Sequence, residues 1–229
     1  MEQQLIDARD RGLILTGQIE ARGLVKARAE TKQVQKAIYD LAAELLYLPG
    51  EKPRFWHKQI LRVGKDTVNP YSVKVTNRVI QPGDIAFFDL GPVLNVETDL
   101  GRTIIVPGPD IDADKLRIRD DSERLFLEGK AYYLQNQDIT GQAMYEYIRC
   151  LAESNGWKLS SQLHSGHLIG TFPHEKILGD TKFDYISLAN TRRMSDPDKF
   201  GNKRQWILEI HLVHPDKPFG AFYEDLLTL

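Results

Sequence analysis

The stretch from Asp84 to Thr103 constrains the fold of this chain most strongly, because it places two carboxylates on two neighbouring strands. It reads DIAFFDLGPVLNVETDLGRT. A short apolar run of strand length ends at Asp89, a Gly-Pro pair breaks it, and the next strand carries Asp99. Carboxylates flanked by apolar residues are costly to bury unless a cation meets them. Arginine and metal ions are the usual cations, and we infer a pair of divalent metal ions.

The composition indicates a globular protein built on one core. The chain has 229 residues, of which 41% are hydrophobic and 27% charged, and its formal net charge is -2. We therefore expect a single domain over residues 1–229. Because positive and negative residues are balanced, we expect no nucleic-acid partner.

The sequence lacks the usual features of membrane-spanning, secreted or disulfide-bonded proteins. No apolar run approaches the length of a membrane span, and the segment from Met1 to Gln4 lacks the features of a signal peptide. The single cysteine, Cys150, excludes an internal disulfide framework and fits a reducing environment. We therefore expect a cytoplasmic protein without a membrane partner. Because its neighbours are apolar, we also expect Cys150 to be buried and unreactive.

Apolar periodicity and turn signals divide the chain into helices and strands. Helical spacing covers about residues 3–48, with a break at Arg22-Gly23 and with Thr31 as a cap for the second helix. Two further helices are expected over 114–133 and 141–154, the latter capped by Thr140. Strands are expected over 59–63, 85–88, 96–106, 157–159, 206–213 and 219–229. The polar segment 176–205 is the longest loop-like region, and such loops are often functional.

The two halves of the chain resemble each other in their order of elements. Thr31 opens a helix that is followed by a strand region with His57, and Thr140 opens a helix that is followed by a strand with His167. The two separations differ by one residue. Helix-then-strand units repeated in this way favour a duplicated α+β domain.

Five ionisable residues interrupt apolar runs of strand composition: Asp89, Asp99, His167, Glu209 and Glu224. Strand interiors favour apolar and β-branched residues, so these intrusions require partners. Only Arg102 lies close to any of them in sequence, and one guanidinium cannot neutralise four carboxylates. Four carboxylates and one imidazole suit Mn²⁺, Co²⁺ or Zn²⁺, and carboxylates can bridge two ions. The pattern predicts two divalent ions, with Mn²⁺ as the first choice.

The order of these motifs resembles that of the pita-bread metallopeptidases, which include methionine aminopeptidase, aminopeptidase P, prolidase and creatinase. The chain shows D-x-G-P and D-x-x-R-T, then G-H-x-I-G-x(3)-H-E, then a glutamate in each of the last two strands. The resemblance covers residues 60–229. It implies an α+β fold in which helices cover a curved antiparallel sheet with an internal pseudo-twofold repeat. In length the chain resembles a catalytic domain without the N-terminal domain of aminopeptidase P and prolidase.

The resemblance also implies a role for each ligand. Asp89 would chelate one ion, Asp99 and Glu224 would bridge both, and His167 and Glu209 would complete the second. His174, seven residues after His167, would hydrogen-bond the scissile carbonyl or the oxyanion. Glu209 would also carry a proton. We expect Glu224, rather than the adjacent Asp225, to be the last ligand, and the Asp225→Asn variant to be nearly silent.

The chain departs from the family pattern at several positions. Asp89 and Asp99 are one residue closer than is usual, and the region that often holds a substrate-side histidine reads NPYS from Asn69 to Ser72. His57 is a candidate for that substrate-binding role. His164 and His211 are further substrate-binding candidates, with an ordinary core position as the alternative for each.

The function implied by the resemblance is that of a metal-dependent aminopeptidase of the Xaa-Pro aminopeptidase or dipeptidase type. The expected partner is a peptide or dipeptide, and a homodimer is one oligomeric option. Two alternatives stay open: a non-enzymatic pita-bread module that binds a peptide or protein, and a creatinase-like hydrolase of a C–N bond. Retention of all five ligands favours the peptidase, because binding modules tend to lose ligands and creatinase-like sites do without the metal.

Overall fold

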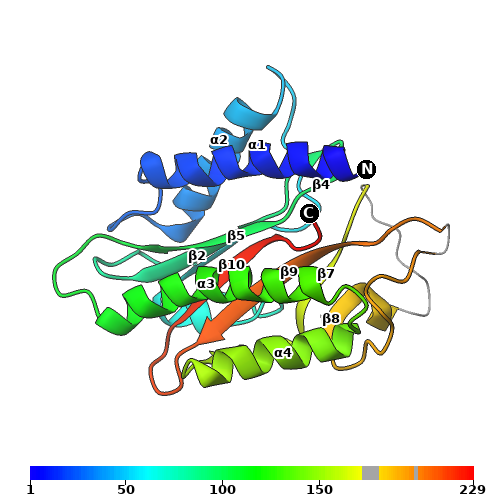
Figure 1. Ribbon diagram of the computed structural model, residues 1–229. Helices are drawn as coiled ribbons and strands as arrows, with labels where there is room; N and C mark the ends of the chain where they lie inside the picture. Colours follow the sequence, from blue (N-terminus) through cyan, green and yellow to red (C-terminus); the bar gives the residue numbers. More distant parts are fainter. Residues whose placement is uncertain (172–180, 199–200) are drawn as a thin grey trace.

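The computed structural model describes residues 1–171, 181–198 and 201–229, and an antiparallel sheet lies at its centre (Figure 1). The main path of the sheet runs in the order β1-β2-β5-β10-β9-β7-β8, and β6 pairs with β9. The strands are β1 Ile60–Val63, β2 Ile85–Leu90, β5 Leu100–Ile105, β6 Lys158–Leu159, β7 His164–Ile169, β8 Tyr185–Ser187, β9 Gln205–Val213 and β10 Gly220–Leu226. A separate hairpin joins β3 Val93–Leu94 to β4 Val96–Glu97.

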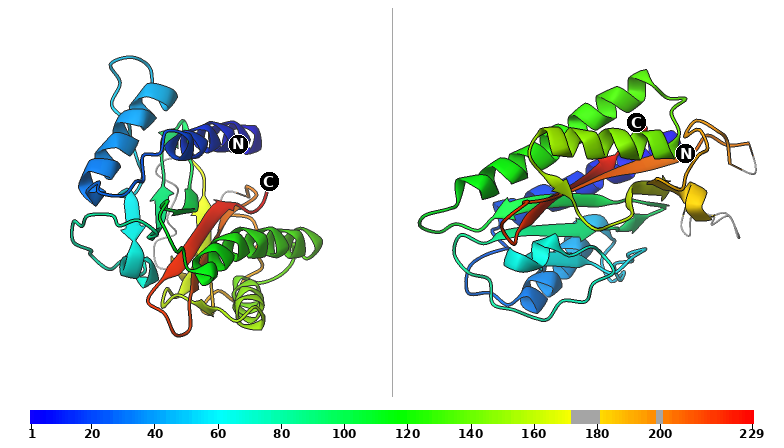
Figure 2. Two further views of the ribbon diagram at one scale, coloured as in Figure 1. Left: turned by 90° about the vertical axis from the view of Figure 1, so that its left-hand side faces the viewer. Right: turned by 90° about the horizontal axis from the view of Figure 1, so that it is seen from below.

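Two pairs of helices pack on the sheet, one pair on each half (Figures 1 and 2). The first pair is α1 Glu2–Ala21 and α2 Thr31–Leu46, and the second is α3 Ala113–Gln135 and α4 Gly141–Ser154. Helix α1 contacts β4 and β5, and α2 contacts β1. Helix α3 contacts β9 and β10, and α4 contacts β6, β7 and β8. Each pair encloses its own cluster of buried apolar side chains.

The alternation of side chains along the strands separates this core from the opposite face of the sheet. In β2, Phe88 packs into the apolar cluster of α1 and α2, whereas Phe87 and Asp89 line a cavity on the other face. In β9, Leu208 packs into the second cluster and Glu209 lines the same cavity. The period of two in a strand therefore directs the ionisable residues away from the helices.

The strand order confirms the predicted duplication. The first half contributes β1, β2 and β5, and the second half contributes β7, β9 and β10. Read along the sheet, β1-β2-β5 is followed by β10-β9-β7, so the two halves are arranged in reverse order about the β5–β10 junction. That junction is the centre of the sheet and lies beside the cavity.

Three local expectations are corrected. Glu30 rather than Thr31 is the N-cap of α2, and the backbone N–H of Glu30 donates to Gln33 at 3.3 Å. Asp99 lies in a short break between β4 and β5, because the chain there changes partner from the β3–β4 hairpin to β2. Cys150 is exposed, since it falls on the outer face of α4. The predicted cap of α4 is confirmed: the Thr140 hydroxyl accepts from the N–H of Ala143 at 3.1 Å.

No helix in the described parts of the chain combines the length and apolar character needed to cross a membrane. The predicted loop 176–205 includes the β8 strand and the start of β9, and its residues 176–180 and 199–200 lie outside the described ranges.

Candidate active site

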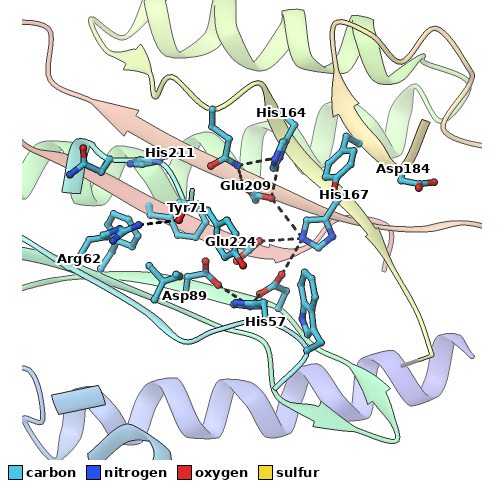
Figure 3. Close-up of a pocket in the computed structure, with 18 residues that line it drawn as sticks. His57, Arg62, Tyr71, Asp89, His164, His167, Asp184, Glu209, His211 and Glu224 are labelled. Atoms are coloured by element: carbon cyan, nitrogen blue, oxygen red, sulfur yellow. Dashed lines mark hydrogen bonds and ion pairs between the residues drawn. The ribbon is translucent and has the colours of Figure 1, made fainter. Parts of the chain in front are cut away.

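A cavity of about 510 Å³ lies on the face of the sheet opposite the helices. Strands β1, β2, β7, β8, β9 and β10 contribute residues to it, as do the segments around His57 and Asp99 (Figure 3). All five predicted metal ligands line this cavity: Asp89, Asp99, His167, Glu209 and Glu224. His57, His164 and His211 line it as well. His174 lies outside the described residues, so its predicted role stays a prediction.

The sheet register places three of the carboxylates in one row. Asp89 in β2 and Glu224 in β10 both pair with Gly101 in β5, and Glu224 pairs with Glu209 in β9. A Cβ on Gly101 would lie 2.3 Å from Cε1 of Phe222 and 3.1 Å from Cβ of Glu224. The glycine therefore leaves the space into which the carboxylates on either side can converge.

His167 brings an imidazole to this row from β7. Its Nε2 lies 3.1 Å from Oδ2 of Asp99, 3.8 Å from Oε1 of Glu209 and 3.9 Å from Oε1 of Glu224. Its Nδ1 donates to the carbonyl of Leu168 at 2.7 Å. Metal-ligating histidines commonly donate their other ring N–H to a carbonyl in this way, which fixes the ring orientation.

Burial makes the carboxylates compete for protons. Burial raises the pKa of Asp89 to about 8, and burial together with the neighbouring carboxylates raises the pKa of Glu224 well above its usual value. Burial also opposes ionisation of Asp99, but the imidazoles of His57 and His167 outweigh it and lower the pKa. For Glu209, burial is outweighed by the contact with His164, so its pKa is lowered as well.

The two imidazoles respond to the same carboxylates. Burial lowers the pKa of His57 and of His167, but the negative charges around them prevail. Asp89 and Asp99 raise the pKa of His57 to about 10, and Asp99 and Glu209 raise that of His167 to about 9. Without a metal ion the cluster therefore holds protons where the family pattern would have cations.

The donor set fits divalent metal ions. Oδ1 of Asp89 and Oε2 of Glu224 are buried and have no hydrogen-bond partner among the described residues. Two groups of three donors share Asp99: His57 with Asp89 and Asp99, and His167 with Asp99 and Glu224. Within each group the donor atoms lie within 4.8 Å of one another. Carboxylate oxygens and imidazole nitrogens are the ligands that Mn²⁺, Co²⁺ and Zn²⁺ accept.

The remaining histidines differ in their contacts. Nδ1 of His164 lies 3.6 Å from Oε1 of Glu209, and Gln162 donates to the carboxylate of Glu209 from its amide. Nε2 of His211 donates to the carbonyl of Thr67 at 2.7 Å, and burial lowers the pKa of His211 to about 4. His164 therefore supports a predicted ligand, whereas His211 is a neutral side chain that ties β9 to the 3-10 turn Gly64–Val68.

Asp225 faces away from the cavity, whereas its neighbour Glu224 lines it. Nε of Arg9 lies 2.6 Å from Oδ1 of Asp225, and Nη2 of Arg102 lies 2.8 Å from Oδ2. Arg102 is thus engaged on the helix side and does not neutralise the carboxylate row. Because this carboxylate is buried between two guanidinium groups, we expect the Asp225→Asn variant to lose stability, and its silence in activity stays a prediction.

Sequence reasoning missed some residues that line the cavity, among them Trp56, Arg62, Tyr71, Gln162 and Tyr185. Arg62 could have been found, because it is an ionisable residue within the apolar strand Ile60–Val63, and the same signal indicated the candidate ligands. The aromatic and amide residues lie in polar segments where nothing distinguishes them from ordinary loop residues.

An antiparallel sheet backed by two helix pairs, with a buried carboxylate–imidazole cluster on its open face, defines the pita-bread class of metallopeptidases. The sequence profile of metallopeptidase family M24 matches residues 13–228, and the chain belongs to this family. The family and the fold that the sequence predicted are therefore confirmed. No curated protein sequence matches the chain significantly.

Solved structures share the fold at low sequence identity. A dipeptidase from Pyrococcus horikoshii OT3 has a TM-score of 0.71 and 18% identity, over 98% of this chain and 56% of that one. An X-Pro aminopeptidase from Thermotoga maritima MSB8 has a TM-score of 0.69 and 17% identity, over 99% and 60%. A methionine aminopeptidase from Thermotoga maritima has a TM-score of 0.67 and 15% identity, over 98% and 90%. The chain thus spans a little over half the length of the dipeptidase and the X-Pro aminopeptidase.

Proposed function

We propose that this protein is a metal-dependent peptidase that hydrolyses the N-terminal peptide bond of short peptides, as an aminopeptidase or dipeptidase of the Xaa-Pro type. The observation that carries the proposal is the convergence of all five predicted ligands in one cavity. The fold similarity to a dipeptidase and to an X-Pro aminopeptidase supports the choice of substrate class.

Two divalent ions are proposed, with Mn²⁺ as the first choice and Co²⁺ or Zn²⁺ as alternatives. Asp89 would hold one ion, His167 and Glu209 would hold the other, and Asp99 and Glu224 would be shared by both. When bound, such ions lower the pKa of a water molecule toward neutrality and polarise the scissile carbonyl.

Glu209 is the side chain best placed to move a proton. Its lowered pKa keeps it ionised, and His164 and Gln162 hold its carboxylate at the edge of the cavity. An ionised carboxylate within reach of the attacking water can accept its proton and deliver it to the departing amine. His174 remains the proposed partner of the developing oxyanion, by analogy with the family motif.

Retention of the ligands distinguishes this proposal from a binding module or a creatinase-like hydrolase. A module that only binds peptides has no need for four buried carboxylates, whose burial is costly without a cation. We propose a peptide substrate as the partner, and no nucleic-acid or membrane partner. The cytoplasmic location and the homodimer stay predictions.

The test combines metal analysis with a peptide digest. Purified protein is dialysed, its metal content is measured by mass spectrometry, and it is incubated with a synthetic peptide library in the presence of Mn²⁺, Co²⁺ or Zn²⁺. We expect bound metal and the loss of one N-terminal residue from a subset of peptides, enriched in proline at the second position. Metal binding with no cleavage of any peptide would favour the binding module.

A further inference from the structure

We propose that His57 is an additional protein ligand, one that gives its Nε2 to the ion held by Asp89 and Asp99. This inference rests on the metal centre of the proposed function. Nε2 of His57 lies 3.1 Å from Oδ1 of Asp99 and 3.3 Å from Oδ1 of Asp89 (Figure 3). Donors at right angles around an ion with bonds of about 2.1 Å are roughly 3.0 Å apart. The three atoms therefore have the spacing of neighbouring ligands.

The imidazole of His57 is oriented in the same way as that of the predicted ligand His167. Nδ1 of His57 donates to the carbonyl of Lys58 at 2.8 Å, as Nδ1 of His167 does to Leu168 at 2.7 Å. In each case the other ring nitrogen, Nε2, faces Asp99: that of His57 lies at Oδ1 and that of His167 at Oδ2. The arrangement gives each of the two proposed metal positions one imidazole and one oxygen of a shared carboxylate.

The surroundings of His57 hold the ring in place. The indole of Trp56 packs edge-on against it with ring centroids 4.5 Å apart, and Nε1 of Trp56 donates to the carbonyl of Thr98 at 2.9 Å. A Cβ on Gly91 would lie 2.4 Å from Cδ2 of His57, so the close approach requires glycine there. Only 7% of the His57 side chain is exposed. A buried side chain fixed on several sides is organised before any ion binds.

The same contacts would also form if a protonated His57 took the place of one ion, and the metal stoichiometry separates the two roles. The experiment measures binding of Mn²⁺ by calorimetry and metal content by mass spectrometry for the wild type, His57→Ala and His57→Gln. Co²⁺-loaded protein is examined by absorption and electron paramagnetic resonance. His214→Ala is the matched control, because His214 contacts Asp114 outside the cavity.

If His57 is a ligand, the wild type binds two ions, and both His57 variants lose one ion or bind it at least about tenfold more weakly. The Co²⁺ absorption bands also change, and His214→Ala behaves as the wild type. Unchanged binding in folded His57 variants, or a gain of a second ion, would overturn the inference. A wild type that binds no divalent ion contradicts the proposed function itself.

Arg62 supports an independent inference at another part of the cavity, on the side of Asp89 away from His167 (Figure 3). Its Nη2 donates to the carbonyls of Pro70, Tyr71 and Val73 at 3.1, 3.2 and 2.7 Å. Its Nε is buried without a hydrogen-bond partner, and no carboxylate among the described residues lies within 4.0 Å of the guanidinium. Arg62 is 4% exposed, and the charges of Asp66 and Asp89 only partly offset the cost of burying its guanidinium, so burial lowers its pKa.

The sheet register sets the distance between Arg62 and the metal ligands. Arg62 pairs with Phe87 and Ile60 pairs with Asp89, so Arg62 lies two residues along the strand from the carboxylate row. Two strand residues span about 6.8 Å. An extended peptide covers that distance in about two residues. A substrate whose scissile bond lies at the ligands can thus bring a carboxylate to Arg62.

We infer that Arg62 binds a carboxylate of the substrate and selects short peptides that present a carboxylate at this position. This deepens the proposed function and rests on it. The carboxylate has two sources, the free C-terminus of a dipeptide or tripeptide and the side chain of an aspartate or glutamate. Arginine suits either source, because its planar guanidinium pairs with carboxylates through charge-assisted hydrogen bonds.

Matched peptides distinguish the sources. We would compare kcat/KM for Ala-Ala, Ala-Ala-amide, Asp-Ala-amide and Ala-Ala-Ala with the wild type, Arg62→Met and Arg62→Lys. Lys58→Met is the control, because it removes a nearby positive charge that does not line the cavity. Arg62→Met is expected to raise KM about 10- to 100-fold for the substrates that carry a carboxylate, and to leave neutral Ala-Ala-amide within about threefold.

An equal loss of kcat/KM for all substrates, or no loss, would overturn this role of Arg62. Arg62 would then only support the segment 70–73 through its hydrogen bonds. A readout without hydrolysis keeps the two proposals apart. In metal-free protein, glutarate is expected to raise the melting temperature of the wild type but not that of Arg62→Met. If peptides are never cleaved but this difference is present, the anion site stands and the peptidase function fails.

Discussion

Single side chains at the cavity differ in what they do, although many of them are buried and charged. Asp99 is in contact with both His57 and His167, and no other carboxylate of the described residues belongs to both donor groups. Glu224 and Asp225 are adjacent in sequence but face opposite sides of β10. These differences make the residue-scale predictions specific.

Asp99→Asn is expected to release most of the bound metal and to lower kcat/KM by more than the 10- to 100-fold typical of losing an outer partner of a metal site. An amide can neither bridge two ions nor balance the two imidazoles. The fold should persist, because the substitution preserves volume. Metal content, circular dichroism and peptide turnover check this against Asp40→Asn, whose exposed carboxylate pairs with Lys36. Full metal occupancy in Asp99→Asn would contradict the bridging role.

Asp225→Asn is expected to destabilise the protein by about 3 kcal/mol, the order of cost when one partner of a buried ion pair is removed. Arg9 and Arg102 would each lose a charged acceptor at 2.6 and 2.8 Å. Glu224→Gln should instead abolish activity and leave the stability of the metal-free protein equal or higher, since the raised pKa favours a protonated Glu224, which glutamine resembles in shape and charge. Urea unfolding in EDTA measures both. A stable Asp225→Asn paired with an unstable Glu224→Gln would reverse the assignment.

At the scale of elements, the register of β5 between β2 and β10 sets the shape of the site. Asp89 in β2 and Glu224 in β10 both pair with Gly101 in β5, so this glycine separates the two carboxylates. The first half of the chain thus supplies Asp89 and Asp99 to the carboxylate cluster. Strand β10, from the second half, adds Glu224.

Gly101→Ala is expected to destabilise the protein by about 1–3 kcal/mol through overpacking, and to weaken metal binding. The new methyl group would meet Phe222 at 2.3 Å and would press on Glu224. Gly17→Ala is the control, because no atom lies within 4 Å of its added Cβ and the residue is in α1. Gly17→Ala should raise the free energy of unfolding by roughly 0.5–1 kcal/mol. Equal melting temperatures and metal affinities for wild type and Gly101→Ala would show that the cavity does not depend on this gap.

At the scale of the whole molecule, much of the fold and many of the residues that line the cavity could be predicted from the sequence. Helical periodicity predicted the four α-helices of the described residues, and carboxylates within apolar strands indicated the candidate ligands, because both signals are local. The β3–β4 hairpin and the break at Asp99 could not be predicted, because the strand changes partner there. The contacts of His57 and the position of Arg62 also depend on pairing between distant segments, and periodicity carries no information about that pairing.

The protonation of the cluster predicts how pH affects the metal-free protein. The pKa of Asp89 is raised to about 8, that of His167 to about 9 and that of His57 to about 10. A group with a raised pKa in the folded state binds its proton more tightly than in the unfolded chain. Its contribution to stability is therefore complete below the unfolded pKa and is lost as pH rises through the folded pKa. From pH 6.5 to about 8 all three effects have the same sign, and from about 8 to 9 the two imidazoles continue the trend.

We therefore expect the melting temperature in EDTA to fall as pH rises from 6.5 to about 9, and the stabilisation by added Mn²⁺ to grow over the same range. The ion replaces protons in the cluster, and a ligand that binds only the folded state stabilises it. Scanning fluorimetry at fixed ionic strength measures both trends. Asp89→Asn removes one of the groups and should flatten the slope in EDTA, whereas Asp40→Asn should leave it unchanged. A melting temperature in EDTA that rises with pH would contradict the raised pKa values of these groups, because it would mean that folding releases protons over this range.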